Sequence, residues 1–227
     1  GRFCALVLLL CAAWTPSEAK IKLPAIVGDN MVLQQSCNVK VWGWAAPEAE
    51  VSVAPSWCGA VRTQADKKGR WCVTVATPAA SFEPRSIALG DGDGEPVVLK
   101  NILIGEVWLC SGQSNMEFPV DRDTTSRWKN AMSTVKQELQ NADYPEMRFF
   151  RVEHQLSPDA PLDDCVGTWE VCTPATAARF SAVGFVFGRK IHNAIHQPVG
   201  LIQSTWGGTH AESWTRKEAM QGDYYER

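Results

Sequence analysis

The sequence predicts an α/β protein in which a small β-sandwich domain, residues 20–101, precedes a three-layer α/β domain, residues 102–227. Two patterns along the chain predict this fold class. Before residue 101, short apolar runs alternate with polar residues and are separated by turn-forming clusters, as in antiparallel β proteins. After residue 101, short apolar strands alternate with stretches of helical spacing, which is typical of a mainly parallel sheet covered by helices.

The first region is expected to hold six short strands. Several of them alternate apolar and polar residues with a period of two, and turn clusters such as Asp66-Lys67-Lys68-Gly69 lie between them. Strands at this spacing favour a β-sandwich over an α/β unit. The expected strands span residues 25–27, 39–44, 51–53, 71–75, 86–89 and 96–99.

The second region is expected to begin with an apolar strand at residues 105–109. A helix over 124–141 follows from the helical spacing of Trp128, Ala131, Met132, Val135 and Leu139. Further on, we expect a strand at 148–152, a loop rich in Pro and Asp at 157–164, a helix at 180–196 and a strand at 199–204. In such sheets ligands bind beyond the carboxyl ends of the strands.

The N-terminus, residues 1–19, has the outline of a secretory signal peptide. An apolar stretch of about 12 residues follows Arg2, and the small residues Ser17 and Ala19 precede Lys20. This stretch is shorter than the roughly 20 residues that a membrane span needs. We therefore expect a protein of the secretory pathway, secreted or lysosomal, with no membrane association after cleavage. Because the first residue is glycine, we expect the natural start to lie upstream.

The net charge and the cysteines indicate which ligands and which disulfides to expect. The net charge is −3, and acidic and basic residues are interspersed, so a nucleic acid partner is not expected. Six cysteines follow the signal segment, and in an oxidising compartment we expect the local pairs Cys58–Cys72 and Cys165–Cys172 to form disulfides. The sequence has no C-x-x-C pair, so no metal site is expected.

A serine at the end of an apolar strand is the first candidate for catalysis. The run from Gly105 to Met116 reads GEVWLCSGQSNM, a strand that ends abruptly in a small polar turn carrying Ser114. Met116 stands where the nucleophile turn of α/β-hydrolases, Gly-x-Ser-x-Gly, has its second glycine, so that fold is not the assignment. A serine hydroxyl becomes nucleophilic when a base takes its proton and donors stabilise the oxyanion. The Ser114 amide and the Asn115 side chain are candidate donors.

A second turn follows the strand expected at residues 199–204. It reads TWGGTHAESW from Thr205 to Trp214, and its paired glycines, Gly207 and Gly208, permit a close approach of backbone amides to a ligand. A second oxyanion donor needs such an approach.

These two segments resemble one family, the sialate O-acetylesterases, which belong to the SGNH-type serine esterases. The resemblance is carried by residues 105–117 and 199–214, with weaker similarity at residues 28–35 and 41–44, so it extends over the chain that follows the signal segment. The fold that it implies for residues 102–227 is the N-terminal portion of an SGNH-hydrolase-like domain.

The resemblance implies a carboxylic ester hydrolase that removes O-acetyl groups from sialic acids or related acetylated sugars through an acetyl-serine intermediate, without a cofactor. On this basis Ser114 is the nucleophile, and the amides of Ser114 and of Gly207 or Gly208 form the oxyanion hole. Residues beside them are expected to line the substrate site; these are Gln113, Asn115, Trp206, His210 and Glu212.

The later segments of the family, a Gly-Glu-Ser-Asn run and an Asp-x-x-His run, do not occur in this sequence. The histidine base and its aspartate are therefore expected beyond Arg227. Because loss of a triad member leaves only residual catalysis, we expect the 227-residue chain alone to be inactive.

The four histidines of the chain are expected to differ in role. His210 follows the glycine pair, and we expect it to be the histidine near Ser114. His154 is expected in a surface loop, and His192 and His196 are expected to be solvated or to cap the end of a helix.

Two alternatives remain open. One is an esterase of the same architecture that acts on acetylated plant or microbial polysaccharide such as xylan. The other is a non-catalytic carbohydrate-binding protein in which sugars stack on Trp42, Trp44, Trp57 and Trp71. Tryptophans at alternate strand positions are more often core residues, and a binding protein does not need the turn at Ser114.

Overall fold

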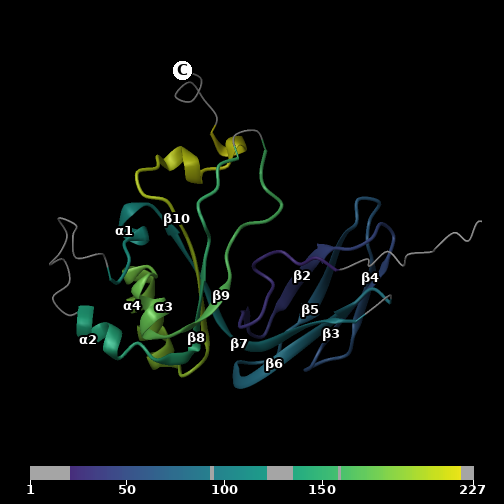
Figure 1. The fold of residues 1–227 in the computed structure, drawn as a ribbon, viewed down its shortest axis with the longest axis horizontal. Coiled ribbons are helices and arrows are strands. Elements are labelled where there is room, and N and C mark those ends of the chain that lie inside the picture. The colour runs from purple at the N-terminus through teal and green to yellow at the C-terminus, as the bar shows by residue number, and fades with distance from the viewer. Residues whose placement is uncertain (1–20, 93–94, 122–134, 158–159, 221–227) are drawn as a thin grey trace, which may run out of the picture.

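The computed structural model describes residues 21–92, 95–121, 135–157 and 160–220, and it shows a mixed α/β fold (Figure 1). Seven strands form one sheet in the order β4-β3-β6-β7-β10-β8-β9, with β1 beside β7, and β2 and β5 form a second sheet. The strands are β1 (Val32–Gln34), β2 (Asn38–Trp44), β3 (Glu50–Pro55), β4 (Val61–Gln64), β5 (Arg70–Ala76), β6 (Ser81–Gly90), β7 (Val97–Gly112), β8 (Tyr144–Arg151), β9 (Trp169–Cys172) and β10 (Val199–Thr205). The helices are α1 (Ser114–Glu117), α2 (Val135–Gln140), α3 (Pro174–Ala178), α4 (Ala182–Ile195), η1 (Ala211–Trp214) and η2 (Lys217–Ala219).

The N-terminal region has two β layers. The antiparallel pair β2–β5 packs against the part of the large sheet formed by β3, β6 and β7, and buried and exposed residues alternate strictly along β5. Val41 and Val73 from one layer share a core with Val53 and Ile87 from the other. Full burial of an aliphatic side chain of this size contributes about 1.5–3 kcal/mol, so the alternating pattern is what holds the layers together.

The long strand β7 belongs to both halves of the molecule. Its first part pairs with β6 and β1, and its last seven residues, from Glu106 to Gly112, pair in parallel with β10. The boundary expected after residue 101 therefore falls inside β7, and the core of the N-terminal region also contains Phe150 and Trp169. A separate β-sandwich is not confirmed, because the larger sheet continues through β7 into the second half of the molecule. The division into two domains stays a prediction.

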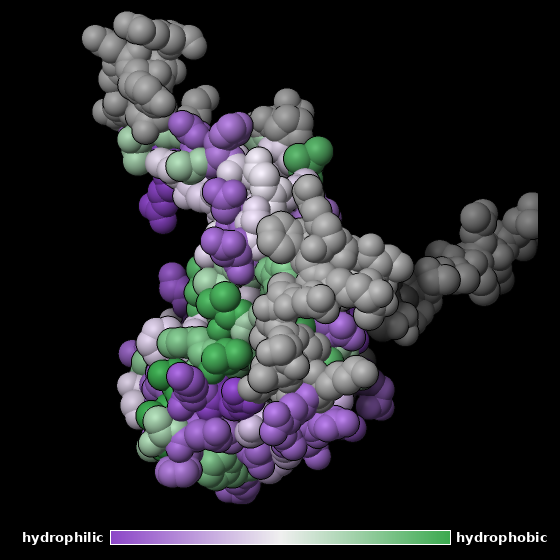
Figure 2. Space-filling view, turned by 90° about the vertical axis from the view of Figure 1, so that its left-hand side faces the viewer, coloured by the Kyte–Doolittle hydropathy of each residue, from purple (hydrophilic) through white to green (hydrophobic). Residues whose placement is uncertain are grey.

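Parallel strands β7, β10 and β8 form the second half of the sheet. On one face, Phe149 and Leu201 pack against Phe180 and Phe185, which lie just before and within α4. Figure 2 views this side and shows hydrophobic residues gathered on it. On the other face, Phe150 packs on Trp169, whose Nε1 donates a hydrogen bond to the carbonyl of Ile26.

The expected three-layer arrangement is incomplete in the part of the chain that the structure describes. Helices α3 and α4 lie on one face of the parallel strands (Figure 1), and the other face is covered in part by the segment around Ile26 and by the side chain of Trp169. The observed covering is thus a single helical layer and a non-helical one.

Most expected elements are confirmed, with three differences. The expected strand at 25–27 is wrong, because Val27 donates to the carbonyl of Pro24 in a turn and the strand forms at Val32–Gln34. The expected strands at 96–99 and 105–109 are one continuous strand, β7. The helix expected over 124–141 is present as α2 at its C-terminal end, and residues 122–134 lie outside the described residues. Several short elements were not expected; these include β4, β9, α3, η1 and η2.

The expected disulfides are wrong: the six cysteines among the described residues are all unpaired. Cys58 follows β3 in the large sheet, whereas Cys72 lies on β5 in the two-stranded sheet. Cys165 packs at the edge of the N-terminal core, whereas Cys172 is buried in the core beneath the helices. Nearness in sequence was misleading because Cys58 and Cys72 belong to different sheets, and Cys165 and Cys172 pack in different cores.

The described helices are all too short or too polar to cross a membrane. The expected signal peptide, residues 1–19, lies outside the described residues.

The tryptophans of the N-terminal region contribute to its core. Trp71 is 3% exposed, and Trp42 and Trp57 pack against the same core. Trp57 also donates to the carbonyl of Ala76. The stacking surface that a non-catalytic sugar-binding protein would need is therefore not supported by this packing.

Candidate active site

The turn that carries Ser114 begins where β7 ends. Gly112 has a φ of 144°, a conformation that glycine adopts far more readily than other residues and that lets the chain turn off the sheet. The carbonyl of Gln113 then accepts hydrogen bonds from the amides of Met116 and Glu117, both 2.9 Å long, and starts the single turn of α1. Ser114 is the first residue of this turn and is exposed.

The turn after β10 lies against the Ser114 turn. Parallel pairing sets Thr205 opposite Gly112, and the amide of Trp206 donates to the carbonyl of Gly112 at 3.0 Å. A Cβ on Gly207 would lie 3.5 Å from the hydroxyl oxygen of Ser114 and 2.5 Å from Oε2 of Glu117. A side chain at this position would therefore displace the Glu117 carboxylate from its place beside the turn. The structure therefore brings together the two segments that were singled out from the sequence.

One of the amides expected to donate to the oxyanion, that of Gly207, is hydrogen-bonded to Glu117. The Gly207 amide donates to Glu117 Oε2 at 2.7 Å. Gly208 has a φ of 80°, and its amide, like that of Ser114, has no acceptor among the residues that the structure describes. Of the glycine pair, Gly208 is therefore the residue whose amide has no acceptor among the described residues.

His154 is a site residue that was not expected from the sequence. It follows β8, which is parallel to β10, so the loop after β8 reaches the same edge of the sheet. Its Nε2 lies 2.8 Å from the carbonyl oxygen of Thr205 and 3.0 Å from Glu117 Oε1. The imidazole also stacks on Trp206, with ring centres 4.2 Å apart and planes 5° from parallel. His154 could have been found from the sequence, because it is a polar residue that follows the carboxyl end of a third parallel strand.

A polar cavity of about 370 Å³ opens beside this group. Gln203 at its base is 3% exposed; its side chain accepts from the Ser181 amide and donates to the Thr205 hydroxyl. Both signs of charge line the cavity, so it suits a polar ligand with several hydrogen-bonding groups. The lining residues are Glu117, Pro119, Arg151, Val152, Glu153, His154, Arg179, Gln203 and Thr205.

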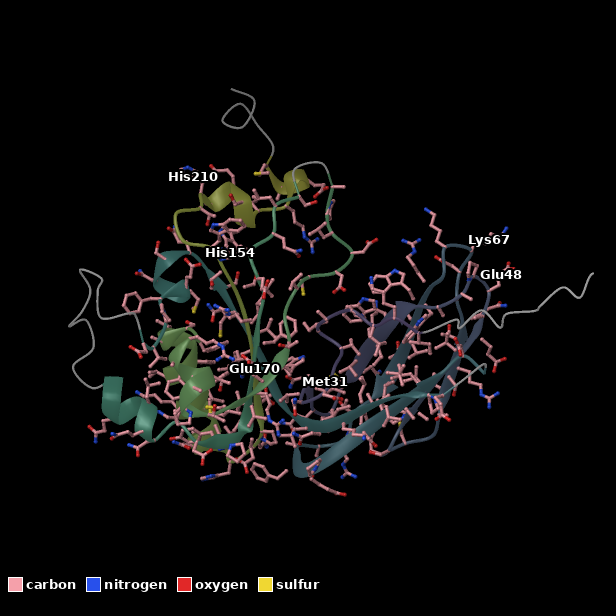
Figure 3. All side chains as sticks on the ribbon, viewed as in Figure 1. Met31, Glu48, Lys67, His154, Glu170 and His210 are labelled. Atoms are coloured by element: carbon pink, nitrogen blue, oxygen red, sulfur yellow. The ribbon has the colours of Figure 1, made fainter. Side chains whose placement is uncertain are left out.

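The other residues expected at the site lie around its rim. Gln113 and Asn115 are exposed on either side of Ser114. His210 and Glu212 are exposed at the start of η1, and among the described residues neither side chain contacts Ser114. Figure 3 shows His154 beside the end of β10 and His210 farther out. The structure places His154 at the turns beside Ser114, and a role for His210 near Ser114 stays a prediction.

The remaining histidines match their expected roles at the end of a helix. His192 Nδ1 hydrogen-bonds the carbonyl of Gln197 at 2.8 Å, and His196 is the left-handed residue that ends α4. Within the described ranges, no side chain hydrogen-bonds the Ser114 hydroxyl, and no group of three or more His, Cys, Asp or Glu side chains could hold a metal ion.

Comparisons with known proteins agree with the resemblance of the two segments. Residues 104–227 match the model of a family described as carbohydrate esterase, sialic acid-specific acetylesterase. The mouse sialate O-acetylesterase is 27% identical over 95% of this chain and 41% of its own length. The human one is 28% identical over 92% of this chain and 42% of its own.

A solved structure shows the same arrangement of elements. The crystal structure of a carbohydrate acetylesterase from Xanthomonas citri superposes with a TM-score of 0.79 and 31% sequence identity, over 92% of this chain and 45% of that one. The chain spans about two fifths of the length of the curated relatives it matches.

Proposed function

Because this chain belongs to the sialic acid-specific acetylesterase family of carbohydrate esterases, we propose that the protein carrying it hydrolyses acetyl esters of sugar hydroxyls with Ser114 as nucleophile. One observation carries the proposal: Ser114 stands exposed at the tip of β7, directly against the Gly207 turn at the end of β10. Nucleophile and oxyanion donors need this proximity.

The proposed reaction has two steps. The Ser114 oxygen attacks the acetyl carbonyl as a base removes its proton, and the sugar hydroxyl leaves with a proton, which gives an acetyl-serine. Water then releases acetate and restores the serine. The amides of Ser114 and Gly208 are the donors proposed for the oxyanion. The base and its aspartate are proposed to lie in sequence that follows Arg227, as the resemblance implies.

For the substrate, we propose O-acetylated sialic acid, with acetylated polysaccharide such as xylan as the alternative. The names of the mammalian relatives support the first, and the carbohydrate acetylesterase from Xanthomonas citri supports acetylated sugars in general. The polar cavity beside Glu117 suits a sugar of either kind. The signal-like N-terminus supports a place in the secretory pathway, secreted or lysosomal.

The test is hydrolysis of an aryl acetate by the full product of the gene, compared with its Ser114→Ala variant. Removal of an acyl-transfer nucleophile costs about 10⁴–10⁶-fold, so activity should fall to background. Ser111→Ala is the matched control, since Ser111 is an exposed serine near the end of β7 and should keep activity. The assignment is refuted if Ser114→Ala hydrolyses the ester like the control. O-acetyl sialic acid and acetylated xylan, assayed side by side, then decide the substrate.

A further inference from the structure

We propose that Glu117 and His154 are positioning residues that hold the Gly207 turn against Ser114, so that the Gly208 amide, rather than that of Gly207, faces the oxyanion. This inference rests on the proposed function for its catalytic consequence. The arrangement itself is a matter of hydrogen bonding and can be tested without any enzymatic activity.

Glu117 joins three segments that are far apart in the sequence. It belongs to α1, three residues after Ser114, and its two carboxylate oxygens contact different partners: Oε2 accepts from the Gly207 amide and Oε1 from His154. Hydrogen bonds to an ionised acceptor are roughly twice as strong as neutral ones. The carboxylate therefore ties the turns after β7, β10 and β8 to one another.

The contacts of His154 determine which of its atoms carries a proton. Nε2 faces two acceptors, the Thr205 carbonyl at 2.8 Å and the Glu117 carboxylate at 3.0 Å, so it must donate. A nitrogen that donates in this way cannot accept the Ser114 proton. Stacking on Trp206 fixes the plane of the ring, and Trp206 is the residue directly before Gly207. His154 therefore supports the turn and does not act as its base through Nε2.

The space around Gly207 explains why the neighbouring amide is the free one. The Gly207 N–H is bonded to Glu117, and an added Cβ would lie 2.5 Å from the same carboxylate oxygen, so Gly207 is the point at which Glu117 holds the turn. Gly208, with its φ of 80°, then changes the direction of the chain. Loss of the hydrogen bond to Glu117 would release the Gly207 amide and let the Gly208 amide move relative to Ser114. A displacement of about 1 Å at a reacting centre can cost about 100-fold in rate.

The arrangement is tested first by NMR on the 227-residue chain. Labels of ¹³C on the tryptophan carbonyl and ¹⁵N on glycine select Trp-Gly peptides, of which the sequence has two, Trp42-Gly43 and Trp206-Gly207. We expect the Gly207 amide proton to move upfield in Glu117→Ala, because it loses an ionised acceptor, whereas Gly43 in β2 stays unchanged. A Gly207 resonance that is the same in wild type and variant overturns the arrangement.

Two more conservative variants test the contact of Glu117 with Gly207 and that with His154 separately, and they disturb packing less than Glu117→Ala. Glu117→Gln can still accept from Gly207 but turns an NH₂ donor toward His154, so the Gly207 signal should shift less than in Glu117→Ala. His154→Phe keeps the stacking on Trp206 and loses both hydrogen bonds. If both variants leave the Gly207 signal in place, His154 and the charge of Glu117 have no part in holding the turn.

Kinetics of the full gene product test the catalytic consequence. We expect kcat for aryl acetate hydrolysis to fall about 10- to 100-fold in Glu117→Ala with little change in KM, because oxyanion donors act in the transition state. Glu95→Gln, an exposed charge change in the N-terminal region, is the control. A normal kcat in Glu117→Ala overturns the positioning role while Ser114→Ala remains inactive. Activity in Ser114→Ala refutes the proposed function instead and leaves the NMR result standing.

Discussion

Replacement of Gly105 by alanine should strain the joint between the two halves of the sheet. Gly105 lies where β7 passes from its pairing with β1 to its pairing with β10, and an added Cβ would lie 2.1 Å from the carbonyl oxygen of Pro198. Since side-chain carbons do not approach closer than 3.0 Å, the backbone must retreat by about 0.9 Å. The Pro198 carbonyl also accepts from the Glu106 amide at 2.9 Å, so this movement weakens a hydrogen bond.

These two effects set the expected size of the change. Overpacking of a filled site costs about 1–3 kcal/mol. A lost hydrogen bond costs about 0.5–1.5 kcal/mol more. We therefore expect Gly105→Ala to lower the free energy of unfolding by roughly 1.5–4.5 kcal/mol.

Urea unfolding followed by circular dichroism measures this difference, with the midpoint converted to a free energy at a common m value. Gly59→Ala is the matched control, because a Cβ there meets no atom within 4 Å, and it should change stability by less than about 0.5 kcal/mol. Equal midpoints for the two variants would refute the reasoning that the backbones of β7 and the chain before β10 are in fixed contact at Gly105.

Two further predictions concern titratable groups. Burial raises the pKa of Cys172 to about 12, and burial also raises the pKa of Cys110, so neither thiol should react with a maleimide at pH 8 until the protein unfolds, whereas the exposed Cys37, Cys58 and Cys72 should react at once. Peptide mass spectrometry gives the order of labelling, and rapid modification of Cys172 in folded protein would contradict its burial. At the β4–β5 turn, the amide of Arg70 is the largest cause that lowers the pKa of Asp66 from 3.8. A lowered folded pKa means that the ionised carboxylate adds stability above the unfolded pKa, and this is lost as the pH falls through the folded value. Asp66→Asn should therefore be less stable than wild type at pH 7 and converge with it in acid; a gap that widens below pH 3.8 would contradict this sign.

Local patterns of the sequence determined most elements of the fold. Alternation along residues 71–75 and the helical spacing of 180–196 each place apolar groups on one side, and β5 and α4 form where these patterns predict them. The turn at 25–27 was assigned to a strand because its apolar run is the same in a strand and in a packed loop. The disulfide pairs failed for a related reason, since spacing along the chain does not reveal which sheet or core a cysteine belongs to.

The sequence by itself was enough to select Ser114 and the glycine pair as candidates, because each lies in a short motif of consecutive residues. Only the tertiary structure decided what surrounds them. The continuity of β7 depends on pairing with β6, β1 and β10, and the approach of Glu117 and His154 depends on three parallel strands ending at one edge. Contacts between residues so distant in the chain follow from strand order and register, which no local pattern encodes.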